Sequence, residues 1–320
     1  MGATKITESQ VIALYNMAFR AAAPPAWVSA VSRYFKSNNA SEDYAWLGQS
    51  PAMREWVGGR QATGVSEFEM QIKNKHFEAT QRIPVELLNR DKTGQISMLL
   101  SKLSNRVQTH WATLLSDLII NGDTLSCYDG TTFFATDHEE GDSGAQSNKI
   151  NVDISELPVL TAGTTTNPAV AQMQLAIGKG IQQLLSFVDD QGEPMNESAT
   201  NFMVMVPTAL MHIAYQALGT TIEVAETQTA MTSLKSRFGF ELPVINNRLT
   251  MEGWTDKFIL FRTDPGAMSF ICQEEVMPQI DYIGRGTELE FREYVHEFGI
   301  NTWRNVGYGF WQNACLITLT

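Results

Sequence analysis

The apolar residues of this 320-residue chain follow a helical period over its longest patterned stretch, residues 94–121. Apolar side chains recur there at spacings of three and four residues, from Ile96 to Ile119, which places them on one face of a helix. Such a helix is about 40 Å long at 1.5 Å per residue, whereas the average helix has only about 11–12 residues. The pattern therefore predicts a helix that spans a whole domain, capped by Thr93 and ended by Asn121-Gly122.

Two more helices are predicted near the start of the chain. Thr7 and Gln10 have the spacing of a capping box, so a helix is expected from there to about Ala23, where two prolines follow and stop it. A second, short helix is expected over residues 26–35. Together they predict a helical arm, residues 1–43, that is too small to have a core of its own.

Alternation of apolar and polar residues predicts a charged β-hairpin after this arm. Residues 66–73 alternate well, and residues 77–83 continue the pattern. We expect these two strands to pair, with the turn at Asn74. Because an isolated two-stranded hairpin is only marginally stable in water, this hairpin needs a surface on which to lie.

The second half of the chain mixes helical and β patterns. Residues 139–167 are polar and are expected to form a loop or a boundary. A helix is predicted from Pro168, a buried strand over 202–206 and another helix over 207–218. The last third is predicted to be mostly β, with strand patterns at 257–261, 267–272, 288–292 and 308–319.

Charge and cysteine content narrow the possible functions. The chain has 35 acidic and 23 basic residues, a net charge of −12. Tight nucleic-acid binding needs clustered lysine and arginine, so we expect no sequence-specific DNA binding. Three scattered cysteines predict no disulfide framework. No apolar run is long enough to predict a membrane span.

One cluster could carry chemistry. Residues 136–142 include Asp137, His138 and Glu139, but a metal site usually needs a second histidine and ligands that converge. The pattern favours a solvated acidic loop; the alternative is a metal-dependent hydrolase that uses these three residues. The stretch Gly178-Lys179-Gly180 lacks the spacing of a phosphate-binding loop, and no nucleophile motif occurs. The sequence thus favours a protein that is not an enzyme and has no cofactor.

Four short blocks occur in an order that resembles the major capsid (major head) proteins of phage Mu and Mu-like prophages. They are YAWLGQSPAMREWVGGR (44–60), NKHFEATQRIPVELLNRD (74–91), CYDGTTFFATDH (127–138) and VGYGFWQNA (306–314). The resemblance implies the Hong Kong 97-type capsid fold, which is an α+β fold. It implies an N-terminal helical arm (1–43), an extended β-hairpin loop (44–90), a peripheral domain (91–140) with its spine helix (94–121), an axial α/β domain (141–264) and a return to the peripheral domain (265–320).

The same resemblance implies a function and partners. The chain is expected to self-assemble, as pentamers and hexamers, into an icosahedral head that encloses packaged double-stranded DNA without reading its sequence. Expected partners are a separate scaffold protein and a portal at one vertex, whereas the presence of a decoration protein is left open. Assembly is expected in the host bacterial cytoplasm, with no role for a membrane. The alternative with the same fold is an encapsulin-like nanocompartment shell.

The extended loop carries the residues that the resemblance implicates in subunit contacts. Trp46 and Trp56 are expected to anchor this loop, because large aromatics in desolvated pockets are the usual interface anchors. The alternative is that both tryptophans belong to the intrachain core. Charged residues of this region are also expected at the subunit interface: Arg60, Glu67, Glu69, Lys73, Lys75 and Arg82.

Overall fold

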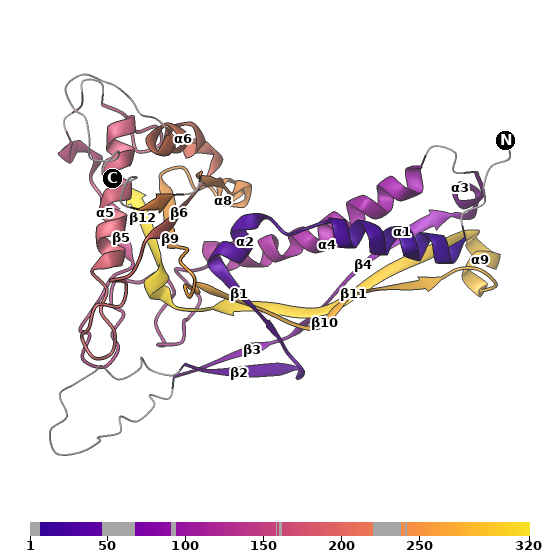
Figure 1. The fold of residues 1–320 in the computed structure, drawn as a ribbon. Coiled ribbons are helices and arrows are strands. Elements are labelled where there is room, and N and C mark those ends of the chain that lie inside the picture. Colours follow the sequence, from indigo (N-terminus) through magenta and orange to yellow (C-terminus); the bar gives the residue numbers. More distant parts are fainter. Residues whose placement is uncertain are drawn as a thin grey trace, which may run out of the picture.

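The long helix predicted over residues 94–121 is present as α4 (Gln95–Ile120) and runs along the elongated part of the molecule (Figure 1). The structure is a computed structural model, and it describes residues 7–46, 68–90, 94–157, 159, 162–219, 238–240 and 242–320. The N-cap of α4 is Gly94, in the left-handed region at φ 73°, where a residue with a Cβ would be strained. The prediction that Thr93 is the cap is therefore wrong.

A four-stranded sheet accompanies α4 along this elongated part (Figure 1). Its first strand is parallel to its neighbour and the other pairs are antiparallel. In order, the strands are β1 (Ser32–Lys36), β10 (Phe270–Ile283), β11 (Val295–Tyr308) and β4 (Lys75–Pro84). Helix α1 (Glu8–Ala21) packs beside α4 and closes a core around Val11, Tyr15, Leu100 and Phe298.

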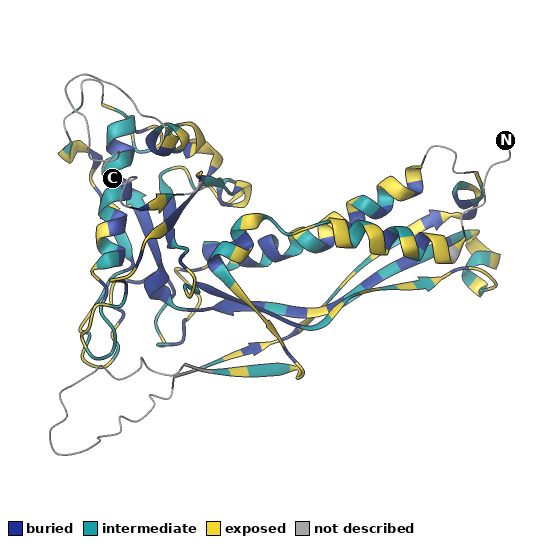
Figure 2. Cartoon of the chain, in the orientation of Figure 1, coloured by how far each residue is buried: buried dark blue, intermediate teal, exposed yellow. Residues whose placement is uncertain are grey.

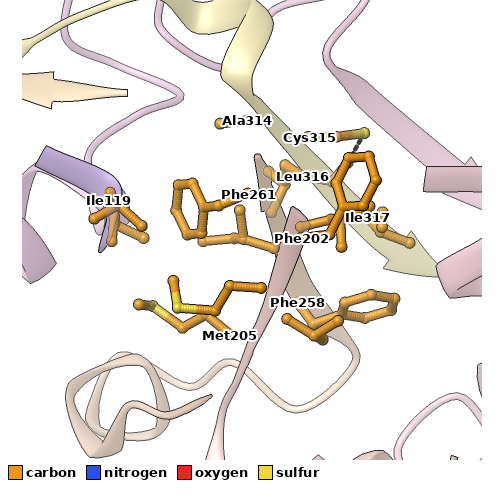
Figure 3. Packing of buried hydrophobic residues seen from close by; sticks show 14 of the residues in the cluster. Ile119, Phe202, Met205, Phe258, Phe261, Ala314, Cys315, Leu316 and Ile317 are labelled. Carbon is orange, nitrogen blue, oxygen red and sulfur yellow. Dashed lines mark hydrogen bonds between the residues drawn. The ribbon is translucent and has the colours of Figure 1, made fainter. Parts of the chain in front are cut away.

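A six-stranded sheet forms the rounded body at the other end. Its path is β5 (Lys149–Val152), β12 (Ala314–Leu319), β9 (Lys257–Arg262), β6 (Asn201–Val206) and β7 (Gly239–Phe240), and β8 (Val244–Ile245) also pairs with β6. Its core contains Phe202, Phe258 and Phe261, and Ile119 near the end of α4 belongs to the same cluster (Figure 3). The long helix therefore joins the cores of both ends.

Helix α5 (Val170–Leu185) packs against the six-stranded sheet. A Cβ at Gly180 would lie 2.5 Å from Ile317 Cδ1, so a larger residue here would force the Ile317 side chain to move. Gly180 is thus a packing position of α5. The other described helices and 3₁₀ turns are α2 (Ala26–Val31), α3 (Val85–Arg90), η1 (Ile154–Glu156), η2 (Thr208–Leu210), α6 (Met211–Gly219), α8 (Asn247–Met251), α9 (Glu288–Glu293) and η3 (Trp311–Asn313).

The arm is helical, but it is shorter than predicted. The capping box of α1 is confirmed, because the Thr7 side chain accepts from Gln10 N and the Gln10 side chain accepts from Thr7 N. Helix α2 ends at Val31, and the chain continues as strand β1 rather than as helix to residue 35. Tyr34 and Phe35 are aromatic residues that favour an edge strand once a sheet is present beside them.

The predicted hairpin is wrong in its pairing, although both strands exist. Strand β3 (Phe68–Lys73) pairs with β2 (Ser41–Trp46), whereas β4 pairs with β11. Asn74 lies between β3 and β4 and is buried, with its side-chain amide donating to Asn39 O. Alternation along one strand indicates a half-buried face but does not identify the strand beside it.

The stretch 288–292 was expected to be a strand and is helix α9 instead. Thr287 caps this helix, since its hydroxyl accepts from Glu290 N. Five alternating residues match a single helical turn as well as a strand. Elsewhere in the last third, strands β9, β10, β11 and β12 confirm the β pattern.

The C-terminal strand does not stay with the rest of the segment 265–320. Strand β12 pairs with β5 and β9, so residues 314–319 lie in the sheet formed by the segment 141–264. The rest of the segment 265–320 stays mainly with α4 and the four-stranded sheet. Among the described helices, none combines the length and the apolar character that a membrane span requires.

Asp264 holds the start of β6 to the end of β9. Its carboxylate accepts from the backbone N–H groups of Thr200 and Asn201 and, at 2.9 Å, from Arg262 Nε. Burial acts to raise the pKa of Asp264, but hydrogen bonds from Thr200 and Arg262 outweigh burial and hold this pKa below its usual value.

We expect this carboxylate to stabilise the fold above its unfolded-state pKa, and the contribution to be lost as pH falls through its lower folded-state pKa. The variant Asp264→Asn should be less stable than the parent near pH 7, with a difference that shrinks toward acid pH. Unfolding in urea at several pH values measures this. A stability difference that is unchanged between pH 7 and pH 3 would contradict the assignment.

Candidate subunit-interaction surface

The hairpin β2–β3 is the extended element of this fold, because it projects from the body beside the four-stranded sheet (Figure 1). Its register runs from Ser41 opposite Lys73 to Trp46 opposite Phe68. Near the base, Ile72 packs closely on Gly307 of β11. A Cβ added at Gly307 would lie 2.4 Å from Ile72 Cδ1. Glycine at this position therefore allows the hairpin to lie directly on the sheet.

A polar network centred on the buried residues Gln273 and Asn74 holds the base of the hairpin. Gln273 of β10, fully buried, donates to Asn74 Oδ1 at 2.8 Å and accepts from Tyr44 Oη at 2.9 Å. Glu42 accepts from Ser37 Oγ at 2.9 Å, and this bond lowers the pKa of its carboxyl. Buried polar groups that are all paired fix one geometry, so the network sets the direction in which the hairpin leaves the body.

The structure places the backbone of only some of the predicted interface residues of this hairpin. Trp46 lies at the end of β2, and Glu69 of β3 lies opposite Ala45; their side chains are not described. Trp56, Arg60 and Glu67 lie outside the described residues. The interface role of these residues stays a prediction, as does the alternative of an intrachain core for the tryptophans.

The remaining predicted residues do not form one cluster. Lys73 ends β3 at the hairpin base, and Lys75 begins β4. Arg82, further along β4, binds Glu293 at 2.8 Å and Glu297 at 2.5 Å within the same chain. The charge of Arg82 is thus matched within the chain. An interface role for these three residues stays a prediction.

The acidic loop predicted over residues 136–142 is only partly solvated. Asp137 and Glu139 are exposed, but His138 between them is fully buried. Neighbouring side chains of this extended stretch point to opposite sides, so the three residues of the hydrolase alternative do not converge. Among the described residues, no group of histidine, cysteine and acidic side chains could hold a metal ion.

His138 is part of a buried junction instead. Its Nδ1 lies 2.5 Å from Asp129 Oδ2, and its ring stacks on Trp311 with centroids 4.0 Å apart. Its Nε2 faces Asn148 Oδ1 at 3.3 Å. Both ring nitrogens therefore face oxygen acceptors, an arrangement that suits an imidazole held for structure and not one free to accept a proton from a substrate.

Glu140 completes the junction. One carboxylate oxygen accepts from Trp311 Nε1 at 2.9 Å, from Gln312 Nε2 at 3.0 Å and from the hydroxyl of Tyr128. Burial is the main cause of the raised pKa of Glu140. Since η3, with Trp311 and Gln312, lies between β11 and β12, these contacts fix the point where the chain passes from one sheet to the other. No local sequence signal identifies this junction, because its members are far apart in the chain.

Comparisons with known proteins agree with this architecture. A family model described as "Mu-like prophage major head subunit gpT" matches residues 6–177. The chain is 32% identical over 117 residues to the Mu-like prophage FluMu major head subunit of Haemophilus influenzae, covering 37% of this chain and 38% of that protein. It is 29% identical over 114 residues to the major capsid protein of Escherichia phage Mu, covering 36% and 37%. The matches thus span less than two fifths of these relatives.

A solved structure shows the fold. The procapsid of bacteriophage JBD30 is similar with a TM-score of 0.55 and 21% identity, over 98% of this chain and 76% of that one. At this identity the likeness concerns architecture alone. The α+β, Hong Kong 97-type fold expected from the sequence is confirmed.

Proposed function

Because the chain belongs to the family of Mu-like prophage major head subunits, we propose that it is the major capsid protein of a Mu-like tailed bacteriophage or prophage. Many copies self-assemble into an icosahedral head that encloses double-stranded DNA. The family match over residues 6–177, more than half of the chain, carries this proposal. The capsid fold of the whole described chain supports it.

The elements of the structure suggest how the parts of the subunit divide this work. Helices α1 and α2 are the N-terminal arm, and the hairpin β2–β3 with residues 47–67 is the extended loop. Helix α4 and the four-stranded sheet are the peripheral domain. The six-stranded sheet with α5 and α6 is the axial domain, to which residues 314–319 return.

The head is built in the host cytoplasm with a separate scaffold protein and carries a portal at one vertex. The net charge of −12 suits a wall that does not retain DNA through phosphate contacts. Purified head particles should contain double-stranded DNA that survives nuclease treatment. Particles filled instead with a single cargo protein would favour the nanocompartment alternative and overturn the proposal.

The variant Trp56→Ala should impair shell formation while leaving the free subunit folded. A buried tryptophan is among the residues whose removal weakens interfaces most, by about 2 kcal/mol or more. Sedimentation of the assembled product measures the effect, and thermal unfolding of the unassembled subunit is the control. Normal shells from this variant would show that Trp56 has no role at the interface. A variant subunit that fails to fold would favour the intrachain-core alternative.

A further inference from the structure

We infer that a buried polar site between α1, α4 and β11 binds ordered water, which links the helix of the N-terminal arm to the four-stranded sheet. The site is formed by Tyr15, Ser104 and Arg304 and is called the arm joint below. The inference does not depend on the proposed function, because it concerns the fold of the single subunit.

Each side chain of the arm joint carries a buried polar atom that has no hydrogen-bond partner among the described residues. These atoms are Tyr15 Oη, Ser104 Oγ and Arg304 Nε, and none of the three residues is more than 2% exposed. Buried polar groups of native proteins nearly always bond to protein or to ordered water. Three such atoms without a protein partner therefore indicate a bound molecule.

Ser104 differs from Ser116, which is also buried on α4. Ser116 donates to Ala112 O at 2.6 Å and accepts from Asn246 Nδ2 at 2.9 Å. A serine inside a helix commonly donates to the carbonyl four residues earlier, yet Ser104 Oγ makes no such bond. Its hydroxyl is available to a molecule outside the helix.

The packing of the two helices brings Tyr15 beside Ser104. Helices α1 and α4 run in the same direction (Figure 1), and both expose one side and bury the other (Figure 2). Gln108 Nε2 donates to Phe19 O at 3.5 Å, which aligns the two helices. Tyr15 lies four residues before Phe19, and Ser104 lies four residues before Gln108. The two hydroxyl-bearing residues are therefore level with each other, about one helical turn from that bond.

Arg304 reaches the same place from the sheet. Its Nη2 donates to Val107 O at 2.9 Å, less than one turn of α4 from Ser104. Its charge also acts on Tyr15, because burial raises the pKa of Tyr15 to about 12 and Arg304 opposes that rise. The three side chains thus converge from three different elements.

The charges at the arm joint favour water over an anion. Glu274 Oε1 lies 3.9 Å from Arg304 Nη1 and already balances the charge of the guanidinium. A bound anion would leave an uncompensated negative charge in the interior, which is costly. Water is neutral and can accept from Arg304 Nε while it exchanges hydrogen bonds with both hydroxyls. Buried waters typically make about three such bonds.

The first test is an experimental structure of the subunit, free or assembled, at a resolution that shows ordered water. A water peak is expected within hydrogen-bond distance of Arg304 Nε and of at least one of the two hydroxyls. Direct bonds among Tyr15, Ser104 and Arg304, with no peak between them, would overturn the inference and leave the proposed function intact. Failure of the chain to form shells would bear on the proposed function alone.

The second test compares urea unfolding of Tyr15→Phe and Ser104→Ala with that of the parent. Each variant should lower the urea midpoint, as should the matched control Ser116→Ala, because a bonded hydroxyl is lost. The double variant should lower the midpoint by less than the sum of the two losses, since both hydroxyls bond the same water. A higher midpoint for Tyr15→Phe or Ser104→Ala would show a hydroxyl buried without a partner. That result, or additive losses, overturns the inference.

Discussion

Replacing Trp311 by alanine is expected to destabilise the subunit by about 3–5 kcal/mol. This side chain is fully buried, stacks on His138 and meets Phe187 edge-on with centroids 5.1 Å apart. The variant also removes one of the three donors to Glu140, at 2.9 Å. Since domains are typically stable by about 5–15 kcal/mol, this loss removes a large share of the stability of the subunit.

Two further variants make the Trp311 prediction specific. Trp311→Phe keeps most of the apolar area but loses the N–H donor, so it should lower the free energy of unfolding by about 1–2 kcal/mol. Trp303→Ala removes a 40% exposed tryptophan from the surface of β11 and should cost clearly less than Trp311→Ala. Urea unfolding of the unassembled subunits ranks all three. If Trp311→Ala lowers the free energy of unfolding by less than about 1 kcal/mol, the junction does not hold the two sheets together.

The second large effect is expected at Arg304, which is buried beneath α4. Its Nη2 donates to Val107 O at 2.9 Å, its guanidinium lies 4.7 Å over the Trp111 ring, and Glu274 Oε1 is 3.9 Å from Nη1. Glu274 is also buried and accepts from the Tyr34 hydroxyl at 2.7 Å. The variant Arg304→Met leaves the Glu274 charge without its cation, which typically costs about 3–5 kcal/mol.

The pH dependence of the Arg304→Met effect follows from Glu274. Burial raises the pKa of this carboxyl in the folded chain, and the charge of Arg304 opposes that rise, so the pKa should be higher still in Arg304→Met. Stability linked to the neutral form is present at low pH and is lost as pH rises through the folded-state pKa. Arg304→Met should therefore be more destabilising at pH 8 than at pH 5, and adding Glu274→Gln should recover much of the loss.

Arg82→Ala is the matched control for Arg304→Met. Arg82 also pairs with glutamates, but its side chain is 55% exposed, and exposed pairs contribute only about 0–1 kcal/mol. Urea unfolding at the two pH values compares these variants. Equal losses for Arg304→Met and Arg82→Ala, or no effect of pH on the former, would be incompatible with a buried charge pair.

The parts of the fold that local patterns determine could be predicted from the sequence. The period of α4 and the capping box of α1 depend on residues within a few positions of each other, and both are found in the structure. The family resemblance depends on short blocks, and the family match confirms it. These features needed no knowledge of distant contacts.

The parts that depend on distant contacts could not be predicted. The partner of β3 is β2, because Gln273 and Gly307 from the far end of the chain form the base on which this hairpin lies. His138 resembles part of a metal site until Trp311 is seen stacked on it. At α9, the alternation alone favoured a strand, but the cap at Thr287 stabilises a helical turn instead.

The most direct measurement for the central claim is electron microscopy of the purified chain. The chain is expressed together with the scaffold protein that the proposed function calls for, and the product is separated by size-exclusion chromatography before negative staining. The proposed function predicts closed particles of uniform diameter in the earliest fractions. A persistent monomer or small oligomer, with the scaffold protein present, would contradict it.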